Sequence, residues 1–140
     1  MNYDNEMCLT LKSNSINESL ARVSVAAFVS QLDPFLNDVE DIKVAVSEAV
    51  TNAIIHGYTD KNSDIHIYCA YKGGDVYIEI KDEGIGIADI TLAKEPLYTS
   101  KPDMERSGMG FSLMQEFMDT LEVISEKGCG TTIKMTKKLV

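Results

Sequence analysis

Apolar residues alternate with polar or small ones in five short stretches of the chain. In the first stretch Met7, Leu9 and Leu11 are separated by single residues, a period of two that predicts a strand with one buried face. The segment Lys72-Gly73-Gly74-Asp75 separates two further stretches and predicts a β-hairpin. The predicted strands cover residues 7–12, 65–71, 76–80, 121–126 and 131–135.

Three other segments repeat their apolar residues at helical spacing. Ser15 and Glu18 have the spacing of a capping box before the first of them. Proline disfavours helix at the residue before it, so Asp33-Pro34 is expected to end this helix, and Gly57 to end the second. The first two apolar stripes consist of Ile16, Leu20, Val23 and Ala27, and of Ile42, Ala45, Val46, Ala49 and Ala53. The predicted helices cover residues 15–31, 37–57 and 109–118.

The order of these elements predicts an α+β fold, in which a mostly antiparallel sheet is covered by helices on one face. Between residues 84 and 108 the periodicity fades, and Pro96 and Pro102 interrupt what remains. A loop of this length is too long for a mere connector in a small domain, so we expect it to be functional.

The composition is that of an ordinary soluble protein. The chain has 140 residues, of which 44% are apolar and 25% charged, so we expect a single domain over residues 1–140. Thirteen basic and 22 acidic residues give a net charge of −9, which argues against sequence-independent binding of nucleic acid. No apolar run approaches the roughly 18 residues that cross a bilayer, and the polar start of the chain has no signal-peptide core, so no membrane association is expected.

The cysteines also narrow the choice of protein class. Cys8, Cys69 and Cys129 are odd in number and lack a CxxC spacing, which excludes a full disulfide framework and an obvious zinc site. We therefore expect the protein in a reducing cytoplasm.

Glu48, Asn52 and His56 follow one another at intervals of four residues on the second predicted helix. They border the apolar stripe, where a carboxylate and a carboxamide side by side can serve as a proton acceptor and a Mg²⁺ ligand. A polar helix margin that only covers the core would have the same spacing, and for this triplet alone that interpretation is favoured.

Asp82 stands at the end of a predicted strand, and Gly84 and Gly86 follow it. A carboxylate there can accept a hydrogen bond from the amino group of a base, and the glycines let the backbone approach a ligand closely. The same residues also occur in ordinary turns.

Ser107-Gly108-Met109-Gly110 opens the third predicted helix, where free backbone N–H groups and the helix dipole favour phosphate. Arg106 in the preceding loop could neutralise phosphate charge. Lys94 is more simply interpreted as a solvated surface residue. Gly130-Thr131 begins the last predicted strand, where threonine is common in any case. Neither a P-loop nor a GxGxxG fingerprint is present.

Four short motifs, which we call boxes, follow one another along the chain: Glu48xxxAsn52, Asp82xGly84xGly86, Gly108xGly110 and Gly130-Thr131. In this order they resemble the ATP site of the GHKL superfamily, with a lid-length loop between the second and third. A stand-alone chain of this size is similar to the anti-sigma factor kinases of that superfamily. The segments 22–29, 48–58 and 105–111 resemble those of the sporulation type, and the resemblance covers nearly the whole chain.

The resemblance implies a two-layer α/β sandwich, the Bergerat fold, and an ATP-dependent serine kinase. Such a kinase holds a sigma factor inactive, phosphorylates a serine of an anti-anti-sigma protein and works as a dimer with ATP or ADP and Mg²⁺. It implies that Glu48 is the catalytic base and that Asn52 holds Mg²⁺. It also implies that Asp82, supported by Thr131 through water, receives the adenine amino group. Four glycines and an arginine would approach the nucleotide and its phosphates: Gly84, Gly86, Gly108, Gly110 and Arg106.

Two alternatives remain open at this point. One is a nucleotide-gated binding module with vestigial kinase activity, against which the intact Glu48 argues. The other is a related stress-response anti-sigma kinase with a different sigma partner, and the segment 22–29 favours the sporulation type over it.

Overall fold

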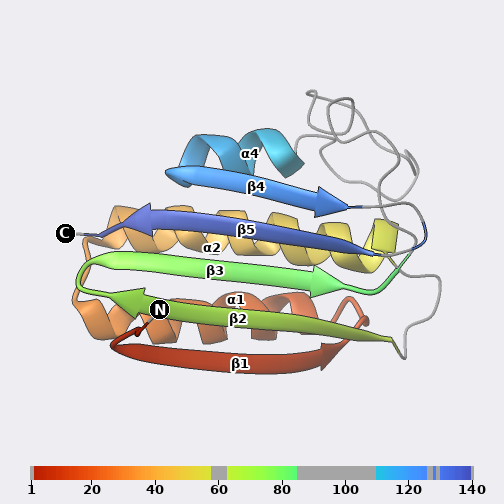
Figure 1. Cartoon of the computed structure of the whole chain (residues 1–140), viewed down its shortest axis with the longest axis horizontal. Helices are drawn as coiled ribbons and strands as arrows, with labels where there is room; N and C mark the ends of the chain where they lie inside the picture. Colours follow the sequence, from red (N-terminus) through yellow and green to blue (C-terminus); the bar gives the residue numbers. More distant parts are fainter. Residues whose placement is uncertain (1, 58–62, 85–109, 126–127, 129, 140) are drawn as a thin grey trace.

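The computed structural model describes residues 2–57, 63–84, 110–125, 128 and 130–139. Figure 1 shows a sheet with helices behind it. The strands are β1 (Asn5–Lys12), β2 (Asp64–Lys72), β3 (Asp75–Asp82), β4 (Thr120–Ser125) and β5 (Thr131–Lys138). The helices are α1 (Asn17–Val29), η1 (Ser30–Leu32), α2 (Leu36–Asn52), η2 (Ala53–Gly57) and α4 (Gly110–Phe117).

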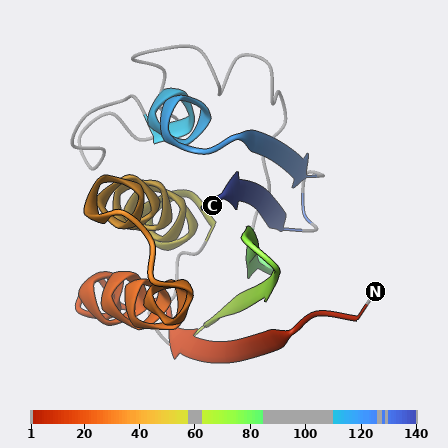
Figure 2. The same cartoon turned by 90° about the vertical axis from the view of Figure 1, so that its left-hand side faces the viewer.

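The strands form a single antiparallel sheet in the order β1-β2-β3-β5-β4. Seen from the side in Figure 2, the helices α1, α2 and α4 all lie on one face of this sheet. The prediction of an α+β fold with a two-layer sandwich is therefore confirmed, as are the positions of the five predicted strands.

The core lies between the sheet and the helices. Period-two alternation on the strands brings Ile67, Ile78 and Met135 to the covered face, where each is essentially inaccessible to solvent. The predicted stripe of α2 is confirmed, because all five of its residues are buried. The other face of the sheet is open and carries polar and aromatic side chains such as those of Tyr68 and Tyr77.

The predicted stripe of α1 is wrong. Ile16, Leu20 and Val23 are exposed by 76%, 51% and 56%. The residues that pack on the core come from a second stripe, displaced around the same helix: Ala21, Val25, Phe28 and Val29. Both stripes have helical periodicity, so the spacing of apolar residues alone could not distinguish them.

The predicted capping box is also absent. The N-cap position belongs to Ile16, whose side chain makes no capping hydrogen bond. Glu18 instead forms an ion pair with Arg22 one turn further along, with 3.4 Å between Oε2 and Nε. Asn17 fastens the start of the helix by donating from Nδ2 to the carbonyl of Lys12 at 2.9 Å.

Two further predictions concern the long loop and the cysteines, and the described residues include only part of each. Of the long loop over residues 84–108, only Gly84 lies among the described residues. Cys8 and Cys69 are free thiols, and Cys129 is not described. In the part of the chain that the structure describes, no helix combines the length and apolar character needed to cross a membrane.

Candidate functional site

Two of the four sequence boxes, and the described residues of the other two (Asp82 and Gly84, and Gly110), meet at one end of the sheet. Because neighbouring strands are antiparallel, β3 ends where β5 begins, and Asp82 lies directly opposite Thr131. Figure 1 shows that α2 ends and α4 begins at this same end of the molecule. We call the end defined by Asp82, Thr131 and Gly110 the site end.

Asp82 occupies a core-facing position at the last residue of β3 and is only 4% exposed. Its Oδ1 accepts a hydrogen bond from the backbone N–H of Gly84 at 2.9 Å. Burial raises the pKa of the Asp82 carboxyl above its ordinary value, and hydrogen bonds from the backbone N–H groups of Gly84 and Thr131 offset part of that rise. A buried acceptor is thus held in a fixed orientation at the margin of the core.

Gly130 makes this arrangement possible. Its φ of +82° lies in the left-handed region that favours glycine. A Cβ atom at this position would lie 2.2 Å from the carbonyl oxygen of Asp82 and 2.8 Å from the Cα of Glu83. The backbone entering β5 therefore passes too close to the end of β3 for any side chain.

Thr131 is buried and makes direct contacts with Asp82 and Ser125. Its backbone N–H contributes to holding Asp82, and its hydroxyl pairs with the Ser125 hydroxyl at 2.8 Å. Ser125 Oγ also donates to the carbonyl of Gly130 at 3.0 Å. The sequence analysis missed Ser125, although the pairing of β4 with β5 places it opposite Thr131.

Glu48 and Asn52 lie one turn apart near the end of α2, and both are half-buried beside the stripe. This confirms their predicted place at the core margin. The described residues hold no group of three or more His, Cys, Asp or Glu side chains that could bind a metal ion. A Mg²⁺ ion in a phosphoryl-transfer site needs only one or two protein ligands, since phosphates and water fill the rest. The carboxamide of Asn52 fits that requirement.

Gly110 is the first residue of α4, so its neighbourhood includes N–H groups without partners inside the helix. The predicted site residues Gly86, Arg106 and Gly108 lie outside the described residues. His56 belongs to the π-helical turn η2, which continues α2 at the site end.

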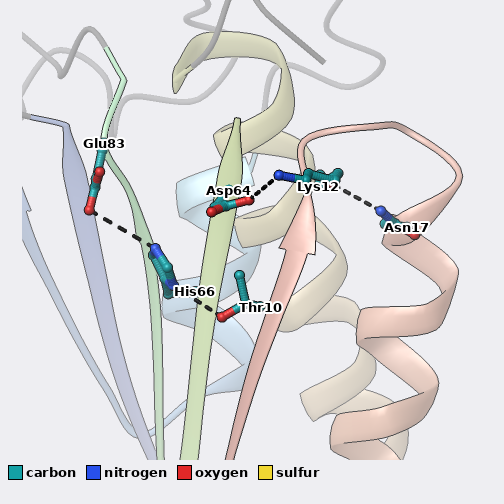
Figure 3. A network of polar contacts seen from close by, with 6 residues as sticks. All are labelled: Thr10, Lys12, Asn17, Asp64, His66 and Glu83. Atoms are coloured by element: carbon teal, nitrogen blue, oxygen red, sulfur yellow. Dashed lines mark hydrogen bonds and ion pairs between the residues drawn. The ribbon is translucent and has the colours of Figure 1, made fainter. Parts of the chain in front are cut away.

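A polar network borders the site on the open face of the sheet (Figure 3). Glu83, next to Asp82, lies 4.0 Å from His66 Nε2, and His66 Nδ1 is 3.3 Å from the Thr10 hydroxyl. Beside them Lys12 Nζ contacts Asp64 Oδ1 at 2.9 Å, and this hydrogen bond lowers the pKa of Asp64. The pairs are exposed, so each stabilises the fold only slightly, but together they link the end of β3 to β2 and β1.

The chain is similar in sequence to a known domain family and to known proteins. The histidine kinase-like ATPase domain matches residues 12–137. An anti-sigma F factor of Clostridium kluyveri is 57% identical over 135 residues, which cover 96% of this chain and 95% of the relative. An anti-sigma F factor of Oceanobacillus iheyensis is 53% identical over 136 residues, covering 96% and 93%.

A solved structure has the same fold. The crystal structure of the RsbU and RsbW domains of a Mycobacterium tuberculosis protein superposes with a TM-score of 0.71. The match covers 96% of this chain and 32% of that longer chain, at 20% sequence identity.

The close approach at Gly130 can be tested by Gly130→Ala. The added methyl group meets the backbone of Asp82 and forces a strained φ, so we expect the free energy of unfolding to fall by about 2–4 kcal/mol. Gly128→Ala is a matched control, because Gly128 also has a positive φ, +87°, but nothing within 4 Å of its Cβ position. That variant should lose only about 1–2 kcal/mol. Equal losses in urea denaturation would show that the contact with Asp82 is unimportant.

Asp82→Asn tests the electrostatic state of the buried carboxyl. A raised pKa in the folded state means that ionised Asp82 destabilises the fold, and this penalty appears as pH rises above the unfolded value of 3.8. Asn keeps an acceptor oxygen without the charge. We therefore expect the stability of Asp82→Asn relative to the parent chain to increase between pH 4 and pH 7 in thermal melts without nucleotide. A flat profile for Asp82→Asn would contradict the burial effect.

Proposed function

Since this chain belongs to the histidine kinase-like ATPase family and, within it, to the anti-sigma F factors, we propose that it inhibits a sigma factor and acts as a serine kinase. In the presence of ATP it binds the sigma factor, and it transfers the γ-phosphate to a serine of an anti-anti-sigma protein. Residues 1–140 act as one domain, as a homodimer in the cytoplasm. The observation that carries this proposal is the buried carboxylate of Asp82, held at the site end by backbone N–H groups.

Adenine recognition is assigned to Asp82. Its carboxylate is an acceptor with a fixed direction, suited to the exocyclic amino group of adenine. Gly84 and Gly86 allow the backbone to approach the nucleotide. Thr131 supports Asp82 from the neighbouring strand, directly through its backbone N–H.

The phosphates are assigned to the helical side of the site. Gly108, Gly110 and Arg106 lie at or just before the start of α4, where the helix dipole and backbone N–H groups favour negative charge. Asn52 is the protein ligand for Mg²⁺, which neutralises phosphate charge when it is bound.

Glu48 is assigned as the general base, one helical turn from Asn52. The serine hydroxyl oxygen of the partner attacks the γ-phosphorus, the bond from that phosphorus to the ADP oxygen breaks, and Glu48 takes the hydroxyl proton. Phosphoryl transfer depends mainly on positioning and charge neutralisation, so one base beside an ion-binding amide is sufficient.

The proposal is tested by incubating the purified chain with Mg²⁺, labelled ATP and the anti-anti-sigma protein of the same organism. The expected result is phosphoserine on that protein. Tight ATP-dependent binding of the sigma factor without any phosphoserine would reject the kinase activity and favour a nucleotide-gated binding module.

Glu48→Gln should separate catalysis from nucleotide binding. The amide cannot accept the serine proton, so transfer should slow by about 10² to 10⁴ while ATP affinity remains nearly intact. Glu40→Gln is the control, because Glu40 is an exposed carboxylate on the same helix, paired with Lys43 at 3.4 Å. Single-turnover rates that are equal in the parent and in Glu48→Gln would remove Glu48 from the chemistry.

The γ-phosphate should couple nucleotide and sigma-factor binding. ADP lacks the group that Arg106 and the start of α4 would hold, so we expect sigma-factor affinity to be higher with ATP by about 5- to 150-fold, the usual range of such coupling. By linkage, the sigma factor must raise the affinity for ATP relative to ADP by the same factor.

Arg106→Ala should shrink this factor, and Lys94→Ala in the same segment of the sequence should not. The measurement is sigma-factor affinity with ATP and with ADP for the three chains. Equal affinity with both nucleotides in the parent chain would exclude the γ-phosphate as the switch.

A further inference from the structure

Lys137 has an unusual place in the fold. The core-facing positions of β5 are Thr131, Ile133, Met135 and Lys137, with Leu139 just beyond the strand, and all of them are buried. Lys137 is thus the one charged residue in a row that is otherwise apolar except for Thr131, and its side chain is only 10% exposed. A buried ammonium group is costly unless polar partners surround it.

Its partners come from two different helices. Nζ donates to the carbonyl oxygen of Phe117, the last residue of α4, at 2.6 Å. It also lies 3.7 Å from Oδ2 of Asp41, in the second turn of α2. A positive charge at the carboxyl end of α4 has the favourable sign for the helix dipole and satisfies one of its last carbonyl groups.

The neighbouring residues fasten the same end of α4. The N–H of Asp119 donates to the carbonyl of Thr136 at 2.9 Å, and the N–H of Lys138 donates to Oδ2 of Asp119 at 2.7 Å. Three successive residues of β5, Thr136, Lys137 and Lys138, therefore contact the C-terminal end of α4 or the residues just after it. Lys137 is the one whose side chain also reaches α2.

These contacts lie at the end of the molecule opposite the site end. At 1.5 Å per residue, α4 extends about 10 Å from Phe117 to Gly110, and α2 extends about 16 Å from Asp41 to Asn52. Figure 1 shows both helices running along the sheet between its two ends. The two helices pack against each other, with Phe111 and Met114 of α4 in the shared core.

We propose that Lys137 is a positioning residue: by joining the end of α4 to the start of α2, it sets the relative direction of the two helices that carry the phosphate and Mg²⁺ groups. This inference rests on the proposed function. An apolar side chain of similar size could fill the same space, and buried ion pairs are often replaceable in this way without loss of stability. It could not provide directional contacts to both helices.

The experiment compares phosphate-dependent with adenine-dependent binding. Titration calorimetry would measure the affinities of Mg²⁺-ATP and of adenosine for the parent chain, Lys137→Met and Lys138→Met, at a temperature where circular dichroism shows each chain folded. Lys138→Met is the matched control, because it removes the same charge from the next residue, which is exposed and bonds Asp119 only through its backbone.

For Lys137→Met we expect ATP affinity to fall by about 3- to 30-fold, with adenosine affinity changed by less than about twofold. Lys138→Met should leave both unchanged. A purely structural role would lower both affinities together or neither. Asp41→Asn should shift the same ratio in the same direction, and it serves as the test if Lys137→Met does not fold.

An unchanged ratio of the two affinities in Lys137→Met, or in Asp41→Asn if that variant is the test, overturns the proposal. If the parent chain binds ATP much more tightly than adenosine while the variant keeps that preference, only the role of Lys137 fails. If the parent chain binds neither ligand, the proposed function itself fails.

Discussion

The approach of two backbones at Gly130 is the constraint on which the candidate site depends. The carbonyl of Asp82 occupies the space where any other residue at position 130 would place its Cβ. This contact brings Thr131 opposite Asp82 and allows its N–H to hold the carboxylate. Ser125 completes the arrangement from β4 by bonding both Gly130 and Thr131. A charge that burial disfavours is thus held in one orientation by backbone N–H groups of Thr131 in β5 and of Gly84 just after β3.

Much of the fold could be predicted from the sequence, because strands and hairpins depend on short-range patterns. The alternation in β2 and β3 and the glycines between them were sufficient to place both strands. The buried face of α1 could not be predicted, since two apolar stripes on that helix have the same period and only the packing partner selects one. The predicted capping box needs Ser15 at the N-cap position, but α1 begins one residue later, with Ile16 there.

Some residues of the candidate site could be predicted from the sequence, and others could not. Asp82 and Asn52 stand in local patterns whose chemistry is visible from residue types and spacing. Ser125 depends on register between strands, and Lys137 lies beyond the predicted end of its strand. Both became visible only when residues distant in the sequence were paired in space. The segment with Gly86, Arg106 and Gly108 rests on the sequence alone.

The arrangement divides the proposed work between the two layers of the fold. In the proposed function Asp82 receives the adenine, which ATP and ADP share, so the sheet residues around it would not distinguish the two nucleotides. On that proposal, a difference between the two nucleotides acts through α2, α4 and the segment between β3 and α4. The helices rest on the sheet mainly through apolar contacts, which resist compression but have little directional preference. Polar contacts at the far end, with Lys137 at their centre, supply the direction that those apolar contacts lack.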